Sequence, residues 1–248
     1  MLQFFTKKTF LKDLLDGFVD MHSHILPGID DGAKSIAESI DLIAGLQALG
    51  VKQFMPTPHV MQDFYPNNDE TIGNAYQQLL YALDAKTRSE ITINPAAEYM
   101  LDDNFLKQLE TQEMFTLKGH YLLIEMSYFQ PPINLEEIIY KIKTKGYFPI
   151  LAHPERYSFY HNAKEQYLKM KQLGCFFQLN MLSLSAHYGK NVEKAANYLI
   201  ENDLIDFIAT DTHNLNHIKK LSNLTLNKGL AKKLPAIIEK TCSTFSVI

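Results

Sequence analysis

The chain has 248 residues, of which 46% are hydrophobic and 21% charged, and its net charge is −4 at pH 7. This size and composition suit a single α/β domain with a sizeable core, and the acidic balance excludes the strongly basic surface of a nucleic-acid-binding protein. No apolar run approaches the roughly 18 residues that a membrane span needs. The two cysteines, Cys175 and Cys242, provide no disulfide framework, so we expect a cytoplasmic protein.

The first 17 residues differ from the rest of the chain. They are amphipathic but lack the long apolar region and the small-residue cleavage site of a signal peptide. From residue 18 onward, no repeat, low-complexity tract or long linker divides the sequence. We therefore expect an N-terminal extension over residues 1–17 and a single domain over residues 18–248.

Short apolar runs of strand length alternate with helix-like stretches along this domain. The seven predicted strands are 18–22, 51–56, 91–97, 121–126, 147–152, 175–180 and 204–210. Ser35 and Glu38 predict a capping box at the first helix, and Gly50, Gly146 and Gly174 mark the ends of three helices. Because apolar strands separated by helices form parallel sheets, the pattern predicts an α/β fold, a distorted TIM-like (β/α)7 barrel.

Potential metal ligands collect at the C-terminal ends of these strands, where a barrel of this kind builds its active site. Six of the seven strands deliver such residues: His22 and His24, His59, Glu98, Glu125, His153, and Asp211 with His213. The loop after the first strand adds Asp30 and Asp31, whereas the sixth strand ends in Asn180, a weak ligand. Without cations, so many carboxylates and imidazoles in one place would face desolvation and repulsion between like charges. We therefore expect two or three divalent ions, and the nitrogen and oxygen donors favour manganese, iron or zinc.

The motifs DMHSHILPGIDDG, TPH, AEY, IEMS, AHPERY and DTHN, in this order, resemble the polymerase-and-histidinol-phosphatase (PHP) superfamily. The similarity is closest to the manganese-dependent protein-tyrosine phosphatases of bacterial capsule and exopolysaccharide operons. The resemblance implies the PHP fold and a trinuclear site. Its implied ligands are His22, His24, Asp31, His59, Glu98, Glu125, His153, Asp211 and His213.

The same resemblance implies a phosphotyrosine protein as substrate, in particular the tyrosine-rich tail of a membrane-linked bacterial tyrosine kinase. Such relatives often carry an arginine after the DTH motif, where it helps to hold phosphate. This chain has HNLNHIKK instead, which leaves His217 or Lys219 to take that place.

A site with several divalent ions suits the hydrolysis of phosphate monoesters, because the ions lower the pKa of bound water to about 7 and so provide hydroxide. Arg156, three residues after His153, is expected to clamp the phosphate, and Arg156 and Asp31 are the predicted catalytic residues. A thiol mechanism is excluded, because neither cysteine is followed by the arginine that a Cys-x5-Arg motif requires.

Aromatic residues in the loops after the strands are expected to stack on the phosphotyrosine ring. They are Phe64, Tyr65, Tyr128, Phe129 and Tyr157. Phenolate, with a pKa near 10, is also a better leaving group than a serine alkoxide.

Three alternatives stay open at this point. One is a small-molecule phosphatase on the same barrel, such as a histidinol-phosphate phosphatase. Another is an amidohydrolase, although Glu125 stands where many of these enzymes carry a modified lysine. The third is a catalytically silent module that binds a kinase tail. The oligomeric state is open as well.

Overall fold

A computed structural model describes residues 8–247. Its centre is a ring of short parallel strands: β2 (Phe18–Ser23), β3 (Val51–Pro56), β4 (His59–Val60), β5 (Thr92–Ile93), β6 (Glu98–Met100), β7 (Tyr121–Glu125), β8 (Phe148–Ala152), β9 (Phe176–Asn180) and β10 (Phe207–Ala209). They pair in the orders β2-β3-β5 and β4-β6-β7-β8-β9-β10. The ring closes where the His24 N–H donates to the Thr212 carbonyl at 3.0 Å and the Asp211 N–H donates to the His22 carbonyl at 2.8 Å.

The second predicted strand matches β3, and the short strand β4 follows it after Thr57 and Pro58. The third predicted strand, 91–97, is not continuous: it contains β5 alone, and Pro95 lies between β5 and β6. Proline lacks the N–H that a sheet ladder needs, so Pro58 and Pro95 interrupt the pairing between these short strands. The remaining predicted strands correspond to single elements, although the last is shorter than expected. The seven-stranded barrel is therefore confirmed, with a distortion caused by proline.

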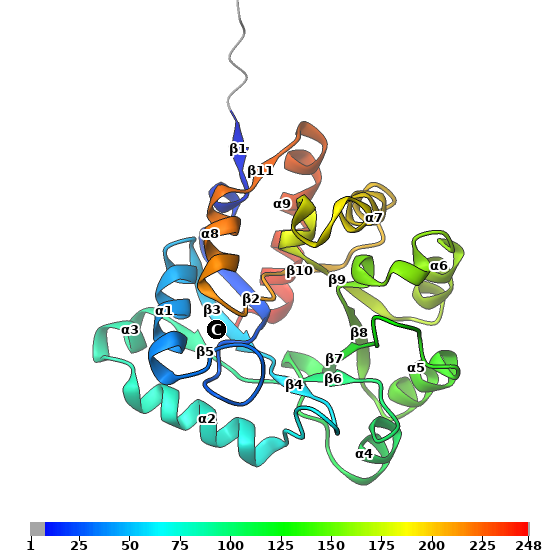
Figure 1. Ribbon diagram of the computed structural model, residues 1–248, viewed down its shortest axis with the longest axis horizontal. Coiled ribbons are helices and arrows are strands. Elements are labelled where there is room, and N and C mark those ends of the chain that lie inside the picture. The colour runs from blue at the N-terminus through cyan, green and yellow to red at the C-terminus, as the bar shows by residue number, and fades with distance from the viewer. Residues whose placement is uncertain (1–7, 248) are drawn as a thin grey trace, which may run out of the picture.

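Helices surround the strands, as Figure 1 shows. Those of the barrel are α1 (Ile36–Gln47), α2 (Asp69–Ala82), α3 (Ala85–Glu90), α4 (Phe105–Thr111), α5 (Leu135–Thr144), α6 (Glu165–Gln172), α7 (Lys190–Glu201), α8 (Leu215–Asn223) and α9 (Lys228–Phe245). No helix within residues 8–247 combines the length and the apolarity needed to cross a bilayer.

The predicted capping box at α1 forms only in part. The Ser35 side chain accepts the Glu38 N–H at 3.3 Å, but the Glu38 carboxylate accepts from the N–H of Lys34 rather than from that of Ser35. Gly50 follows the helix with a φ of +105°, as expected for a residue that stops a helix.

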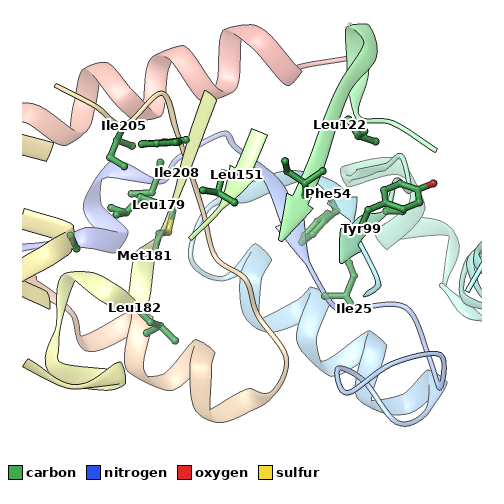
Figure 2. Close-up of a cluster of buried hydrophobic side chains, with 14 of the residues drawn as sticks. Ile25, Phe54, Tyr99, Leu122, Leu151, Leu179, Met181, Leu182, Ile205 and Ile208 are labelled. Atoms are coloured by element: carbon green, nitrogen blue, oxygen red, sulfur yellow. The ribbon is translucent and has the colours of Figure 1, made fainter. Parts of the chain in front are cut away.

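The core lies between the ring of strands and the helices. Figure 2 shows part of it, where Phe54, Leu122, Leu151, Leu179 and Ile208 project from their strands. All five side chains are at most 1% exposed. This packing holds the strand ends, and the polar side chains that they carry, in fixed positions.

The described part of the N-terminal segment packs against the barrel domain. Its strand β1 (Thr9–Phe10) pairs antiparallel with β11 (Thr225–Leu226). Leu11 and Leu15 are fully buried, so residues 9–15 contribute to the same core as residues 18–247.

Candidate metal centre

The two histidines of the HxH motif point into the interior of the barrel. His22 lies in β2 and His24 directly follows it, and the side chains of residues i and i+2 along a strand lie on one face. Both are completely buried, and their Nε2 atoms are 3.2 Å apart. Two nitrogens at this separation are placed to serve the same metal cluster.

Each of these imidazoles is oriented by a partner at its other nitrogen. The Nδ1 of His22 lies 2.8 Å from Oε1 of Gln178, and the Nδ1 of His24 lies 2.8 Å from Oδ2 of Asp30. An acceptor at Nδ1 keeps the proton there and leaves Nε2 free for a metal. Asp30 therefore orients a ligand, while its neighbour Asp31 lies farther out, with a side chain that is 49% exposed.

Glu98 occupies the middle of the centre. Its Oε2 is 3.4 Å from Nε2 of His22, 3.6 Å from Nε2 of His24 and 3.0 Å from Nδ1 of His59. The Nδ1 of His59 is also 2.8 Å from Oε1 of Glu125. A carboxylate with this many imidazole neighbours can bridge two cations.

The donor atoms form three overlapping groups, and the atoms within each group lie within 4.8 Å of one another. The groups are His24, Asp31, His59 and His213; His22, His24 and Asp211; and His59, Glu98 and Glu125. Together they bring eight of the nine predicted ligands to one place. The shared members, His24 and His59, connect the groups into one centre.

Three buried atoms of this centre have no hydrogen-bond partner among the described residues: His59 Nδ1, Glu98 Oε2 and Glu125 Oε1. The Nδ1 of His59 nevertheless lies 3.0 Å from Oε2 of Glu98 and 2.8 Å from Oε1 of Glu125. Buried polar atoms normally find a partner. Donor atoms that converge without bonding to one another are what a divalent cation requires, so these residues fit a metal.

The electrostatics of the centre lead to the same conclusion. Burial by itself lowers the pKa of His24, but neighbouring carboxylates outweigh burial and raise this pKa to about 10. Against the effect of burial, the carboxylates also raise the pKa of His59 well above its ordinary value, and the imidazoles hold the pKa values of Glu98 and Asp211 well below theirs. The buried carboxylates thus require positive charge, which protons or divalent cations supply.

His153 is the predicted ligand that lies outside the three groups. Its Nε2 is 3.2 Å from Oε1 of Glu98, whereas His22 and His59 contact the other carboxylate oxygen, Oε2. His153 and Asp211 both have left-handed backbones, with φ values of +36° and +49°. Such conformations are uncommon for residues other than glycine and often mark functional sites.

Arg156 lies beside the centre and is held on three sides. Its Nη1 donates to Oδ2 of Asp211 at 3.0 Å, and its guanidinium lies 4.8 Å from the ring centre of Tyr128 and 4.3 Å from that of Tyr188. Asn180 donates to the same Asp211 oxygen at 2.7 Å. Within residues 8–247 the guanidinium makes this one hydrogen bond, so further N–H donors are available to a phosphate.

A cavity of about 580 Å³ opens above the centre. His59, Glu125, His153, Asp211 and His213 line its floor together with Asp31 and Arg156. Four of the five predicted aromatic side chains line its walls: Phe64, Tyr65, Tyr128 and Phe129. The Tyr65 ring stacks on that of His59, with centroids 5.6 Å apart.

Two predicted substrate-binding residues lie elsewhere. Tyr157 is fully buried behind the cavity, where its hydroxyl accepts the Met126 N–H at 2.9 Å, so it cannot stack on a substrate. Lys219 is exposed on α8 and does not line the cavity. His217 is closer to the centre, because its Nδ1 accepts the His213 N–H at 3.4 Å.

Gln178 and Tyr188 also belong to the site, although no motif of the sequence includes them. Gln178 could have been noticed, because it is a polar residue in the middle of an apolar run that is predicted to be a buried strand. No signal in the sequence marks Tyr188, which meets Arg156 only through the folding of the β9–α7 connection.

Both cysteines are unpaired, and neither lines the cavity. Burial raises the pKa of the Cys175 thiol to about 12, and burial also raises that of Cys242. Neither thiol is therefore ionised at neutral pH, which agrees with the exclusion of a thiol nucleophile.

The sequence and the fold of this chain are similar to those of known proteins. Residues 18–230 match the family described as capsular polysaccharide synthesis, CpsB/CapC. The chain is 30% identical over 225 residues to the tyrosine-protein phosphatase CpsB of Streptococcus pneumoniae, which covers 87% of this chain and 92% of that protein. It is 29% identical over 224 residues to the tyrosine-protein phosphatase YwqE of Bacillus subtilis (strain 168), and this match covers 89% of this chain and 88% of that protein.

A solved structure from work on YwqE and CpsB, described as unique metal-dependent tyrosine phosphatases, has the same fold with a TM-score of 0.80. The two chains are 27% identical, and the match covers 92% of this chain and 93% of the other. Because the family match spans most of the chain, including every strand of the barrel, this protein belongs to the CpsB/CapC family of capsular polysaccharide synthesis.

Proposed function

We propose that this protein is a metal-dependent protein-tyrosine phosphatase, which hydrolyses the phosphate ester of phosphotyrosine in proteins. One observation carries the proposal. Three overlapping groups of nitrogen and oxygen donors lie at the floor of a cavity that has an arginine at its edge and aromatic walls. The relatives of the chain that are named tyrosine-protein phosphatases support the same activity.

The proposed cofactors are two or three divalent ions, with manganese as the expected metal. The residues that would hold them are His22, His24, Asp31, His59, Glu98, Glu125, Asp211 and His213, with His153 as a further ligand beside Glu98. When bound, such ions neutralise phosphate oxygens and lower the pKa of water to about 7.

The residues of the chain itself bind and orient the substrate. Arg156 donates to phosphate oxygens, and Tyr128 and Tyr188 hold its guanidinium in a fixed plane. Asp31 is half-exposed at the cavity, 3.4 Å from Nε2 of His59 and 3.3 Å from Nε2 of His213, so it is placed to orient the attacking water. The aromatic walls favour a flat phenyl ring over a serine side chain.

The proposed partner is a bacterial tyrosine kinase with a tyrosine-rich tail, whose dephosphorylation controls capsular or exopolysaccharide synthesis. The proposed location is the cytoplasm. Two unpaired cysteines support a reducing compartment.

Parallel assays on three substrates test the activity. We expect the manganese-loaded protein to hydrolyse a phosphotyrosine peptide well above a phosphoserine peptide and above histidinol phosphate. A strong chelator should abolish this activity and iodoacetamide should leave it unchanged, because neither thiol lies at the site. Preference for histidinol phosphate would instead assign the protein to small-molecule phosphatases on the same barrel.

A further inference from the structure

The aromatic wall at Phe129 continues into further exposed apolar side chains, which the proposed hydrolysis of phosphotyrosine does not use. Phe129 is 94% exposed and Ile133 is fully exposed, and both belong to the loop between β7 and α5. Pro131 and Pro132 lie between them. Neighbouring large apolar side chains on a surface often mark a place where another molecule binds.

A second hollow of about 330 Å³ lies beside this loop. Its lining includes Leu101, Leu106, Pro131, Ile133 and Ile138. Leu101 also lines the catalytic cavity, as does Asp102. The two hollows therefore share Leu101 and Asp102 as a common floor, and the loop between β7 and α5 lines both of them.

This floor is held rigidly. The Asp102 carboxylate accepts the N–H of Gln62 at 2.9 Å with one oxygen, and the N–H groups of Asn104 and Phe105 at 3.0 Å with the other. It thus ties the loop after β4 to the start of α4. A preformed surface of this kind binds with a smaller loss of conformational entropy.

We propose that the second hollow binds an apolar side chain of the polypeptide substrate, close in sequence to the phosphotyrosine. This inference rests on the proposed function. A phosphotyrosine bound in the cavity carries chain on both sides, and that chain must cross the rim. An extended chain advances about 3.4 Å per residue, so a side chain within the first few positions from the phosphotyrosine can reach a hollow that adjoins the cavity.

The charge of the rim restricts the occupant further. Asp103 is exposed and lines the second hollow, and Asp63 lines the catalytic cavity. An acidic side chain next to the phosphotyrosine would therefore meet like charge, whereas an aliphatic side chain gains contact with Leu101, Ile133 and Ile138. The charge thus disfavours an acidic flank, and the apolar part of the lining favours an aliphatic one.

A position scan with phosphotyrosine peptides tests this. Each peptide has alanine around the phosphotyrosine, except for one leucine that is placed in turn at each of the four positions on either side. The control substrate is p-nitrophenyl phosphate, which has no flanking residues. We expect one position at which leucine raises kcat/KM about 5- to 30-fold over alanine. Ile133→Ser should remove this gain and leave p-nitrophenyl phosphate turnover unchanged.

Two further variants sharpen the test. Tyr140→Ser, which changes an exposed aromatic residue of α5 that lines neither hollow, should keep the leucine preference. Ile133→Lys should shift the preference at the same position toward an acidic side chain.

Absence of any leucine effect, or its survival in Ile133→Ser, would overturn this inference alone, because p-nitrophenyl phosphate would still be hydrolysed. Failure of the metal-loaded wild-type protein to hydrolyse p-nitrophenyl phosphate and every peptide would refute the proposed function as well.

Discussion

Asp211 divides its two carboxylate oxygens between two roles. Its Oδ1 lies 3.4 Å from Nε2 of His22 and 3.2 Å from Nε2 of His24, whereas Oδ2 accepts from Arg156 and Asn180. A carboxylate with one oxygen anchored twice presents the other in a fixed direction. Asn180 therefore supports the metal centre although it is not a ligand.

Arg156 is the residue at which phosphate binding can be separated from metal binding. We expect Arg156→Ala to lower kcat/KM for phosphotyrosine by roughly 10²–10³, the effect of losing a donor to a developing charge. Metal content should stay intact, because Asp211 keeps its hydrogen bond from Asn180. Arg156→Lys should recover only part of the activity, since a point charge does not reproduce the planar guanidinium.

Elemental analysis beside steady-state kinetics decides this prediction. Near wild-type turnover in Arg156→Ala would contradict the phosphate role. Joint loss of metal and activity would show that Arg156 acts mainly by holding Asp211.

Gln178 should matter for metal affinity although it touches no metal. Gln178→Leu keeps the volume but removes the acceptor that fixes the His22 tautomer, so we expect manganese affinity to fall about 10- to 100-fold. Competition with a fluorescent chelator measures this. Gln172→Leu, on the exposed face of α6, is the matched control and should be silent; equal affinities in both variants would count against the role of Gln178.

At the scale of single residues, the sequence predicts which residues belong to the site better than it predicts what they contact. The motifs identified eight side chains that the structure brings together, because all of them except Asp31 stand at or just after a strand end. Tyr157 was misplaced since the direction of a side chain in an irregular loop does not follow from its distance to a motif. Lys219 was misplaced for a related reason, because its helix turns that residue toward solvent.

The loop that follows β2 shows how a short element determines the site. At Gly32 the chain passes so close to His24 that an added Cβ would lie 2.0 Å from its carbonyl oxygen and 2.5 Å from its Cβ. The Gly32 N–H also donates to Oδ1 of Asp30, whose other oxygen orients His24. Glycine is therefore required for the loop to hold Asp30 and Asp31 against the metal centre.

Gly32→Ala should destabilise the fold by about 2 kcal/mol or more, because the atoms that must move are backbone. It should also lower metal content, since Asp30 and Asp31 shift with the loop. Gly73→Ala is the control, because Gly73 lies within α2 with nothing within 4 Å of an added Cβ; this change should stabilise the protein by up to about 1 kcal/mol. Denaturant unfolding of the two variants measures both effects, and equal stabilities would refute the steric argument.

Elements were predictable to the extent that local sequence determines them. The seven apolar runs and the glycines after α1, α5 and α6 indicate the order of strands and helices. The extra strand β4 and the interruption of the third strand were not predicted, although Pro58 and Pro95 are visible in the sequence. Whether such a proline ends a strand or lies at its edge depends on which neighbour pairs with it, and that is a tertiary property.

The whole molecule concentrates negative charge at the end of the barrel that holds the metal centre, and this links metal binding to pH. In the metal-free protein the neighbouring carboxylates raise the pKa of His24 to about 10, so His24 is protonated at pH 7. A metal must displace that proton, and its apparent affinity should therefore rise with pH between about 6 and 9.

Isothermal titration calorimetry with manganese, in two buffers of different ionisation enthalpy, measures the protons released. We expect at least one proton per chain at pH 7. A heat that is independent of the buffer would contradict the charge balance described for His24.

The central claim is that a cluster of divalent ions, held by the ends of the barrel strands, hydrolyses phosphotyrosine. The most direct test measures metal stoichiometry and phosphotyrosine hydrolysis on the same sample, before and after chelation and again after stepwise addition of manganese. We predict two or three ions per chain, with activity that disappears on chelation and returns as those sites fill. Fewer than one tightly bound ion per chain, with no activity gained from manganese, would contradict the claim.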